Sequence, residues 1–507
     1  MYNLRRLDPS IIILLGTRGN CSEKREELLK ANQWNLVVIC LDTFRYDLLN
    51  HRAPWAVELP HLDRLRGESV QFTHAFGEGE PTIPTRRAFF TGERSFPWRY
   101  RFDTKGMWPT GRGWHKIPPE QPTIAEILLR QGYQTGLISD NYHLFKPTVN
   151  FTRGFLQYEF LRGYESDNYR GGVITAAELT PYVRQPDALE HATLMQYLLN
   201  TRGRRREEDW HTAQTFTRAA AWIRDHQYQE TQPFFLWVDS FGPHEPWDPP
   251  RDYLKPYLSD PQFDGIEFIY PVGLTAKDLS ESEQKRVREL YLAYLTFVDH
   301  WVGHFLEVLA QSRLDQQTIV MLVSDHGTEL MDHGQFSKHA SHLYAHNTQL
   351  FWLIRHPNWE SSECHAFVQN HDLFPTALAL LGGAHGAVAG TNAWQWVENA
   401  SAPQREYVIT GWGSYAAVRD RQWNYFVNFE EPDAQEFLFD LQADPGEYSN
   451  VAEKYPAERQ YRRRVLEKFL GQALPARLND QVIESEAPIR VYFGSSIDQA
   501  KRDAGFV

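Results

Sequence analysis

A threonine and an arginine stand four residues apart in the segment Thr82-Ile-Pro-Thr-Arg86. Proline suits the first turn of a helix, where its missing N–H has no internal acceptor, so we expect a helix to begin here. The Thr82 hydroxyl would then lie at a helix N-terminus, where free N–H groups and the helix dipole favour an anion. Arg86, one turn later on the same face, would add a fixed positive charge. This combination suits attack on a negatively charged ester.

Three apolar runs elsewhere in the chain end at polar side chains. They are residues 35–41, 233–238 and 318–323, which lead into Asp42, Asp239-Ser240 and Ser324-Asp325-His326. Continuous apolar runs of this length are typical of strands buried on both faces. Parallel strands of this kind carry ligand sites outside their carboxyl ends. We therefore expect an α/β fold with a large, mostly parallel central sheet flanked by helices, and a site at its carboxyl edge.

Asp42, Asp325 and His326 are the candidate metal ligands. Two acids and an imidazole that follow different strands are harder to explain as helix caps than one acid alone. Carboxylate oxygen and imidazole nitrogen suit one divalent ion, and these residue types do not choose among Ca, Mg, Mn and Zn. The Thr82 oxygen is a further candidate ligand, because a bound metal would lower the pKa of that hydroxyl and activate it as a nucleophile.

Further polar residues follow predicted strands or lie in glycine-containing loops. They are Asn141, His143, His244, His333 and Lys338. The prolines around His244 would hold its ring in a defined pose. Histidine, lysine and asparagine are the side chains that hold anionic oxygens and protonate a leaving group. We therefore assign catalysis to His244, His333 and Lys338 together with Thr82 and Arg86, and substrate binding to Asn141 and His143.

Helical patterns separate the predicted strands. Thr123-Ile-Ala-Glu126 is a capping box that opens a helix ending at Gly132. Apolar residues recur at helical spacing over residues 216–223 and again over residues 287–309. These helices would cover the sheet and hold its strand ends in place.

The sequence pattern changes after about residue 405. Short β-prone segments separated by polar turns are followed by one helical segment; they are residues 407–410, 415–418, 423–427, 436–439 and 455–470. They predict a small antiparallel sheet closed by a helix. We therefore divide the chain into an N-terminal extension (1–33), a catalytic domain (34–400) and a C-terminal subdomain with a tail (401–507).

Bulk composition excludes several function classes. The 507 residues carry a net charge of −13, which argues against a nucleic-acid partner. The three cysteines, Cys21, Cys40 and Cys364, are too few and too scattered for a disulfide framework or a zinc site. Because no run of about 18 apolar residues occurs, we expect no membrane span and a cytoplasmic protein. The expected partner is a small anionic ester substrate.

Taken in order, these motifs resemble those of the sulfatase family, within the alkaline-phosphatase superfamily. The resemblance covers about residues 34 to 455. Its segments are residues 38–47, Leu59-Pro-His-Leu-Asp63-Arg-Leu65, residues 82–92, Pro243-His244, Ser324-Asp325-His326-Gly327, His333 with Lys338, Phe439-Asp440-Leu441, and Asp444-Pro-Gly-Glu447 with Asn450. So many matches in order make the resemblance highly specific.

The resemblance implies a mixed α/β sandwich and one divalent metal at the carboxyl edge of the sheet. It implies transfer of a sulfuryl or phosphoryl group to the nucleophile. By position, Asp42, Asp325 and His326 would hold the metal. Arg86 would support the nucleophile, while Lys338 and His244 would contact the ester oxygens or act as general acid.

The chain departs from the family pattern at three places. Thr43 stands where the family often has a second acid, and Asn141-Tyr142-His143 replaces the usual Lys-Trp-His segment. Thr82 stands where sulfatases have the Cys or Ser that becomes formylglycine. Oxidation of threonine would give a ketone rather than that aldehyde, so the hydrated-aldehyde route is not expected.

An unmodified threonine resembles the nucleophile of related phosphodiesterases and of phosphoglycerol transferases of the lipoteichoic-acid type. We therefore favour a metal-dependent hydrolase of sulfate or phosphate esters, with Thr82 as covalent nucleophile and a leaning towards phosphoester or phosphonate substrates. Two alternatives remain open: a transferase that passes the group to an alcohol, and a degenerate family member that only binds an anion.

Overall fold

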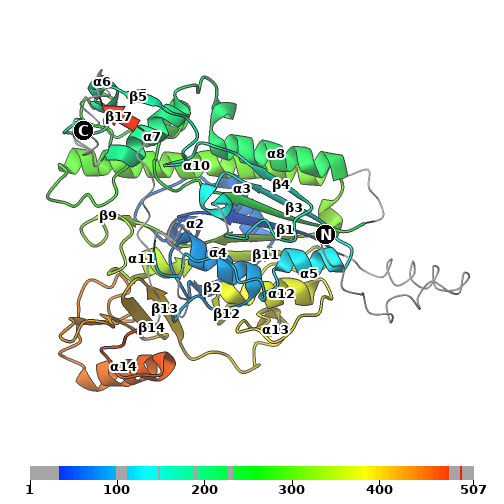
Figure 1. Cartoon of the computed structure of the whole chain (residues 1–507). Coiled ribbons are helices and arrows are strands. Elements are labelled where there is room, and N and C mark those ends of the chain that lie inside the picture. Colours follow the sequence, from blue (N-terminus) through cyan, green and yellow to red (C-terminus); the bar gives the residue numbers. More distant parts are fainter. Residues whose placement is uncertain are drawn as a thin grey trace, which may run out of the picture.

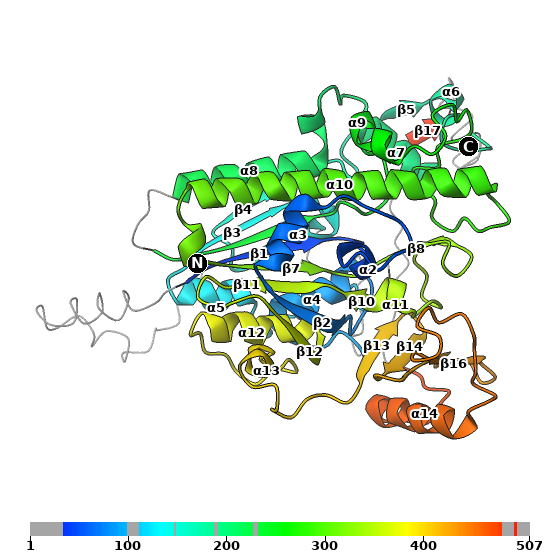
Figure 2. The same ribbon diagram turned by 180° about the vertical axis from the view of Figure 1, so that it is seen from behind.

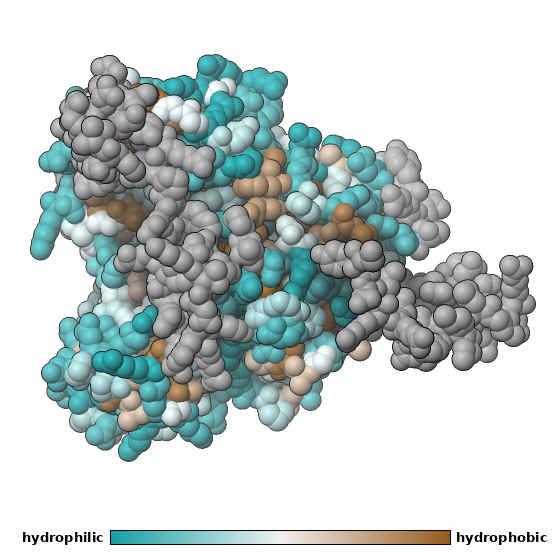
Figure 3. All heavy atoms as spheres, in the orientation of Figure 1, coloured by the Kyte–Doolittle hydropathy of each residue, from teal (hydrophilic) through white to brown (hydrophobic). Residues whose placement is uncertain are grey.

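The computed structural model describes residues 34–98, 111–146, 149–186, 191–226, 232–478 and 491–493. The expected N-terminal extension, 1–33, and Cys21 within it lie outside these residues. A central sheet runs through the molecule, with helices on both of its faces and a smaller sheet at one side (Figure 1). Most of the coloured surface in Figure 3 is hydrophilic.

The central sheet has nine strands in the order β10-β2-β11-β7-β1-β6-β3-β4, with β12 pairing with β2. Their bounds are β1 (Asn35–Leu41), β2 (Val70–Phe76), β3 (Gln134–Ser139), β4 (Gln157–Phe160), β6 (Phe234–Ser240), β7 (Thr318–Ser324), β10 (Gln349–Leu350), β11 (Trp352–Arg355) and β12 (Ser362–Gln369). Pairings between β1, β3, β4, β6 and β7 are parallel, whereas β11 runs antiparallel to β7 and β2. The predicted mixed, mostly parallel sheet is confirmed.

Alternate residues of β1 belong to two hydrophobic cores, one on each face of the sheet. Val37 and Ile39 pack in one core, and Leu36 and Val38 pack in the other. A strand that is apolar on both faces therefore appears as an uninterrupted apolar run, which is the pattern seen in the sequence.

The helices divide between these two faces. One face is covered by α3 (Pro60–Gly67), α8 (His211–His226) and α10 (Glu281–Gln311), and α10 spans the whole width of the molecule in Figure 2. The other face is covered by α4 (Thr82–Thr91), α5 (Ile124–Arg130), α12 (Leu373–Leu380) and α13 (Trp394–Glu398). The capping box predicted at Thr123 is present, because its side chain accepts from the Glu126 N–H and Glu126 accepts from the Thr123 N–H.

Shorter α-helices and strands lie between and beyond these elements. They are α2 (Tyr46–Leu49), α6 (Ala176–Leu179), α7 (Ala192–Thr201), α9 (Arg251–Leu254), α11 (Ala345–Thr348), β5 (Gly172–Ile174), β8 (Glu329–Leu330), β9 (Phe336–Ser337) and β17 (Val491–Phe493). Single-turn helices such as α2 and α11 lie in the loops that follow strands, where they shape the carboxyl edge of the sheet.

A second sheet follows the central sheet in the chain. It is antiparallel, and α14 (Pro456–Leu470) packs against it. Its strands are β13 (Val408–Trp412), β14 (Tyr415–Arg419), β15 (Trp423–Asn428) and β16 (Glu436–Asp440). The predicted antiparallel sheet and closing helix are therefore confirmed.

Among the described residues, no helix is both long enough and apolar enough to cross a membrane. Cys40 and Cys364 are both buried free thiols. Cys40 is the penultimate residue of β1 and packs in the core beneath α4.

Candidate active site

Four neighbouring strands bring the sequence-predicted polar residues to one edge of the sheet. The strands β7, β1, β6 and β3 lie side by side in parallel. The residues that follow them are Asp325 and His326 after β7, Asp42 after β1, His244 after β6, and Asn141 and His143 after β3. The carboxyl edge therefore gathers most of the predicted site.

Asp42, Asp325 and His326 form a compact cluster. One ligand atom from each lies within 4.8 Å of the others, and all three side chains are fully buried. Asp325 Oδ1 accepts backbone N–H groups of Thr43 (2.9 Å) and His326 (2.8 Å), which fixes its orientation. Asp42 Oδ2 accepts no well-formed hydrogen bond from a described residue, and its one cationic neighbour is an Arg86 nitrogen 3.1 Å away. A buried carboxylate oxygen has lone pairs to spare in this position, so this donor set fits a divalent cation.

His326 presents an unprotonated nitrogen to this cluster. Its Nδ1 lies 2.9 Å from the carbonyl oxygen of Gly327, which can only accept, so Nδ1 carries the proton. Burial lowers the pKa of His326 to about 4, although Asp325 opposes that shift. The lone pair on Nε2 is therefore available, and Nε2 lies 3.5 Å from Thr82 Oγ1.

Thr82 is the first residue of α4 and is nearly fully buried. This position agrees with the helix N-terminus predicted from the sequence. Its φ of 24° lies on the positive side, which is unusual for a β-branched residue. Backbone strain of this kind concentrates at functional sites, where the surroundings hold the residue in place. Here it holds the hydroxyl beside His326.

Arg86 lies among three buried carboxylates rather than facing open space. Its guanidinium is 2.5 Å from Asp325 Oδ2, 2.9 Å from Asp239 Oδ2 and 3.1 Å from Asp42 Oδ2. It also donates to the Thr82 carbonyl oxygen at 3.2 Å, so it supports the backbone of the candidate nucleophile. Three carboxylates against one guanidinium leave two negative charges, which is the charge that a divalent ion would neutralise.

Replacing Arg86 with methionine is expected to lower the free energy of unfolding of the metal-free protein by about 3–5 kcal/mol. The change leaves three buried carboxylates without their common partner. Denaturant unfolding in the presence of a chelator measures this loss. Arg86→Lys, which keeps the charge but not the forked donor, is the matched control and is expected to lose less. A loss below about 0.5 kcal/mol for Arg86→Met, typical of a surface substitution, would contradict this role.

Lys338 and His244 lie together on the other side of the cluster. Lys338 Nζ lies 3.0 Å from His244 Nε2, 3.1 Å from Glu245 Oε2 and 3.3 Å from Thr43 Oγ1. His244 Nδ1 lies 2.7 Å from the Glu245 carbonyl oxygen, so Nδ1 carries the proton and Nε2 accepts from Lys338. Burial, reinforced by Lys338, lowers the pKa of His244. The pair therefore offers one cation and one neutral imidazole.

Thr43 occupies the position at which a second acid was expected. Its Oγ1 donates to Asp42 Oδ1 at 2.7 Å, and its backbone carbonyl accepts from Tyr291. Thr43 therefore orients a candidate metal ligand and adds no charge of its own.

Asn141 and His143 form a second layer beyond His244. The Asn141 side chain accepts the His143 N–H at 3.1 Å, and its Nδ2 is buried without a described hydrogen-bond partner. The His143 ring packs edge-on against Phe241, which in turn stacks on His244 with ring centroids 4.3 Å apart. Both residues therefore lie at the same edge, one aromatic ring away from His244.

His333 lies apart from this group. Its ring stacks on Tyr344 with centroids 3.6 Å apart and approaches His346 and Tyr448 at 5.6 and 5.2 Å. None of its contacts within the described residues joins it to Thr82 or Lys338. The structure thus brings together every sequence-predicted site residue except His333.

Sequence reasoning missed three acids at this edge. Asp239 binds Arg86, and Glu245 binds Lys338. Burial opposes ionisation of Glu245, but Lys338 and His244 outweigh it and hold its pKa at about 2. Glu80 is fully buried, and neither of its carboxylate oxygens has a described hydrogen-bond partner. The sequence positions of these acids could have indicated them. Asp239 stands near the end of β6, Glu245 follows His244 directly, and Glu80 stands two residues before Thr82.

Comparisons with known proteins find similar sequences and similar folds over most of the chain. A family model described as Sulfatase matches residues 34–384. The chain is 24% identical over 491 residues to arylsulfatase K of Mus musculus, which covers 88% of this chain and 81% of that protein. It is 26% identical over 469 residues to a sulfatase of Formosa agariphila, covering 85% of this chain and 86% of that protein.

Two solved structures share the fold. The phosphonate monoester hydrolase of Agrobacterium radiobacter superposes with a TM-score of 0.64 at 20% identity, over 86% of this chain and 95% of that chain. A protein in complex with its substrate D-glucosamine-2-N,6-O-disulfate superposes with a TM-score of 0.63 at 17% identity, over 87% of this chain and 98% of that chain.

Proposed function

The chain belongs to the sulfatase family and is a hydrolase of sulfate or phosphate esters, and on that premise we propose that the unmodified hydroxyl of Thr82 is its covalent nucleophile. The observation that carries the proposal is the position of Thr82 Oγ1, 3.5 Å from the unprotonated Nε2 of His326 at the N-terminus of α4. An anionic ester placed there meets free N–H groups and the positive end of the helix dipole.

We assign the binding of one divalent ion to Asp42, Asp325 and His326, with the Thr82 oxygen as a further ligand. When bound, such an ion polarises ester oxygens and lowers the pKa of a hydroxyl beside it. Arg86 supports this arrangement indirectly, because it fixes the carboxylates and the Thr82 backbone carbonyl.

The reaction then proceeds in two displacements. The Thr82 hydroxyl gives its proton to solvent water, and Oγ1 then forms a bond to phosphorus as the bond from phosphorus to the alcohol oxygen breaks. Lys338 and His244, whose Nζ and Nε2 lie 3.0 Å apart, hold the ester oxygens and supply the proton that the departing alcohol takes up. Water then attacks phosphorus in line, which releases phosphate and restores the Thr82 hydroxyl.

The identity of residue 82 favours phosphorus over sulfur. A formylglycine hydrate can expel sulfate by collapsing to an aldehyde, and threonine has no such route. A phospho-threonine is cleared by direct attack of water on phosphorus. The fold shared with a phosphonate monoester hydrolase is compatible with this preference.

A panel of aryl sulfate, aryl phosphate, bis-aryl phosphate and phosphonate monoester tests this preference. We expect kcat/KM to be highest for one of the phosphorus esters, and mass spectrometry of acid-quenched enzyme to find phosphate on the peptide that carries Thr82. Adding glycerol as an acceptor distinguishes hydrolysis from transfer, because a transferase would give glycerol phosphate. Fastest turnover of the aryl sulfate, with no phosphopeptide from any substrate, would contradict the proposal.

A further inference from the structure

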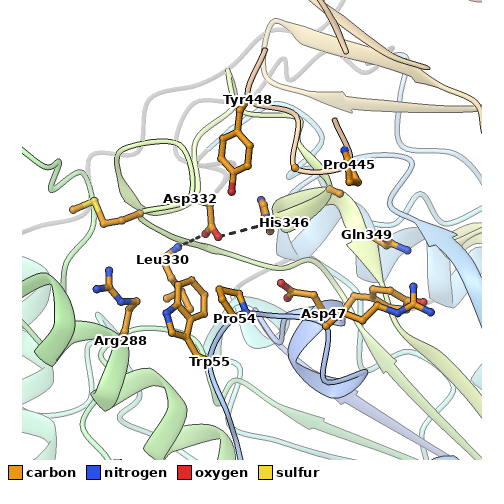
Figure 4. A pocket seen from close by; sticks show the side chains of 15 residues that line it. Asp47, Pro54, Trp55, Arg288, Leu330, Asp332, His346, Gln349, Pro445 and Tyr448 are labelled. Atoms are coloured by element: carbon orange, nitrogen blue, oxygen red, sulfur yellow. Dashed lines mark hydrogen bonds and ion pairs between the residues drawn. The ribbon is translucent and has the colours of Figure 1, made fainter. Parts of the chain in front are cut away.

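A cavity of about 700 Å³ lies beside the carboxyl edge of the sheet (Figure 4). Its walls come from α2 and the loop after it, α10, the turn after β8, α11, and the loop 445–448 of the C-terminal sheet region. None of the candidate metal ligands lines it, and neither do Thr82, His244 or Lys338. Its volume falls within the range of small-molecule pockets.

The two carboxylates in the cavity wall are already paired. Asp47 and Asp332 each lie 2.6 Å from the buried guanidinium of Arg45. His346 approaches Asp332 at 3.6 Å. These acids therefore belong to an internal network, in which Arg45 offsets one of their two negative charges.

Two other guanidiniums at the cavity have no such partner. The side chains of Arg52 and Arg288 both line it, and neither makes a hydrogen bond or an ion pair with a described residue. The guanidiniums of Arg288 and Arg45 both lie over the Trp55 ring, 5.7 Å and 5.4 Å from its centroid, and Arg288 is half-buried. Guanidinium forks without acceptors favour a carboxylate, sulfate or phosphate group.

Aromatic surface is present beside these cations. Trp55 and Tyr448 lie on opposite walls, with Asp332 between them in the view of Figure 4. Tyr448 is 65% exposed, although a large apolar ring gains by being covered. A flat ligand ring between or against these side chains would bury that surface.

We propose that this cavity is a second ligand site, which binds an organic anion that carries a ring. The ring lies against Trp55, and its anionic group pairs with Arg288 and Arg52. An aromatic anion and an acidic sugar share this chemistry. The site is independent of the nucleophile proposed above, because it uses none of the same side chains.

The test uses two probes without an ester bond, toluenesulfonate for an aromatic anion and glucuronate for an acidic sugar. Isothermal titration of the full-length, metal-loaded protein is expected to detect binding of at least one probe. Trp55→Ala and Arg288→Gln should each weaken that binding tenfold or more. Arg52 is an exposed loop residue, and Arg52→Gln should also weaken probe binding. The probe with the lower Kd shows whether the site prefers an aromatic ring or a sugar ring.

Two control variants separate this cavity from other sites. Lys285→Gln removes a charge from an exposed position on α10, one turn before Arg288, and should leave probe affinity unchanged. Lys338→Ala removes the cation of the catalytic edge and should also leave it unchanged. Turnover of an aryl ester by the Trp55 and Arg288 variants should match the unsubstituted protein, which verifies that they fold. The proposal is overturned if neither probe binds, if Lys338→Ala abolishes binding, or if the cavity variants bind normally.

Discussion

Replacing Thr82 with alanine is expected to lower kcat by about 10⁴-fold or more while the protein still binds one divalent ion. The loss is large because the hydroxyl forms the bond to phosphorus, and no described side chain beside His326 can replace it. Metal binding should persist because Asp42, Asp325 and His326 supply the charged donors. Steady-state kinetics on the best phosphorus ester measure kcat, and metal analysis of the same sample measures the number of divalent ions bound.

Two further substitutions at Thr82 sharpen this result. Thr82→Val keeps the branched shape without the hydroxyl, and it should be as inactive as Thr82→Ala. Thr82→Ser restores a hydroxyl and should recover a substantial part of kcat, with phosphate trapped on residue 82. If Thr82→Val turned over the ester at a near-native rate, the nucleophile would have to be another group.

Replacing Asp42 with asparagine is expected to weaken divalent-metal binding by about 100-fold or more and to lower kcat/KM by about 10³-fold. The substitution keeps the shape of the side chain but removes one of the two excess negative charges beside Arg86. The lost charge belongs to the carboxylate whose Oδ2 lies 3.1 Å from Arg86. Calorimetric metal titration measures the first effect, and ester turnover at saturating metal measures the second.

Stability measurements distinguish a lost ligand from a damaged fold. Without metal, Asp42→Asn should cost no more than about 1 kcal/mol, because an amide can still hydrogen-bond Thr43. The unsubstituted protein should gain about 2.7 kcal/mol when metal is present at 100 times its Kd, and the variant should gain far less at that concentration. An equal gain in both proteins would show that Asp42 does not hold the metal.

The residues at the carboxyl edge of the sheet were predictable because a local pattern marks them, namely a polar residue directly after an apolar run. Asp42, Asp325 and His244 each follow an apolar run, and parallel strands end at a common edge. The sequence does not reveal that β7, β1, β6 and β3 are adjacent, since strand order depends on contacts between segments far apart in the chain. Helical spacing likewise placed Arg86 one turn from Thr82 but gave no information on its three buried partners.

His333 shows the limit of motif spacing. It precedes Lys338 by only five residues, yet its ring stacks on Tyr344 rather than joining the catalytic edge. The cavity that contains Arg288 and Tyr448 was equally inaccessible to sequence reasoning. Its walls come from segments that lie hundreds of residues apart, and no single segment has the character of a binding motif.

The pairing of Arg45 with Asp47 and Asp332 has a consequence for how an ion is captured. Arg45 stands three residues after Asp42, and Asp332 follows Asp325 along the next loop; Arg45 also reaches the Thr328 carbonyl oxygen at 3.4 Å. Arg45 therefore joins the segment that follows Asp42 to the segment that follows Asp325, through contacts that do not involve the candidate metal ligands themselves. An incoming ion meets a preassembled pair of donors, and the conformational entropy of bringing two independent loops together is already lost on folding.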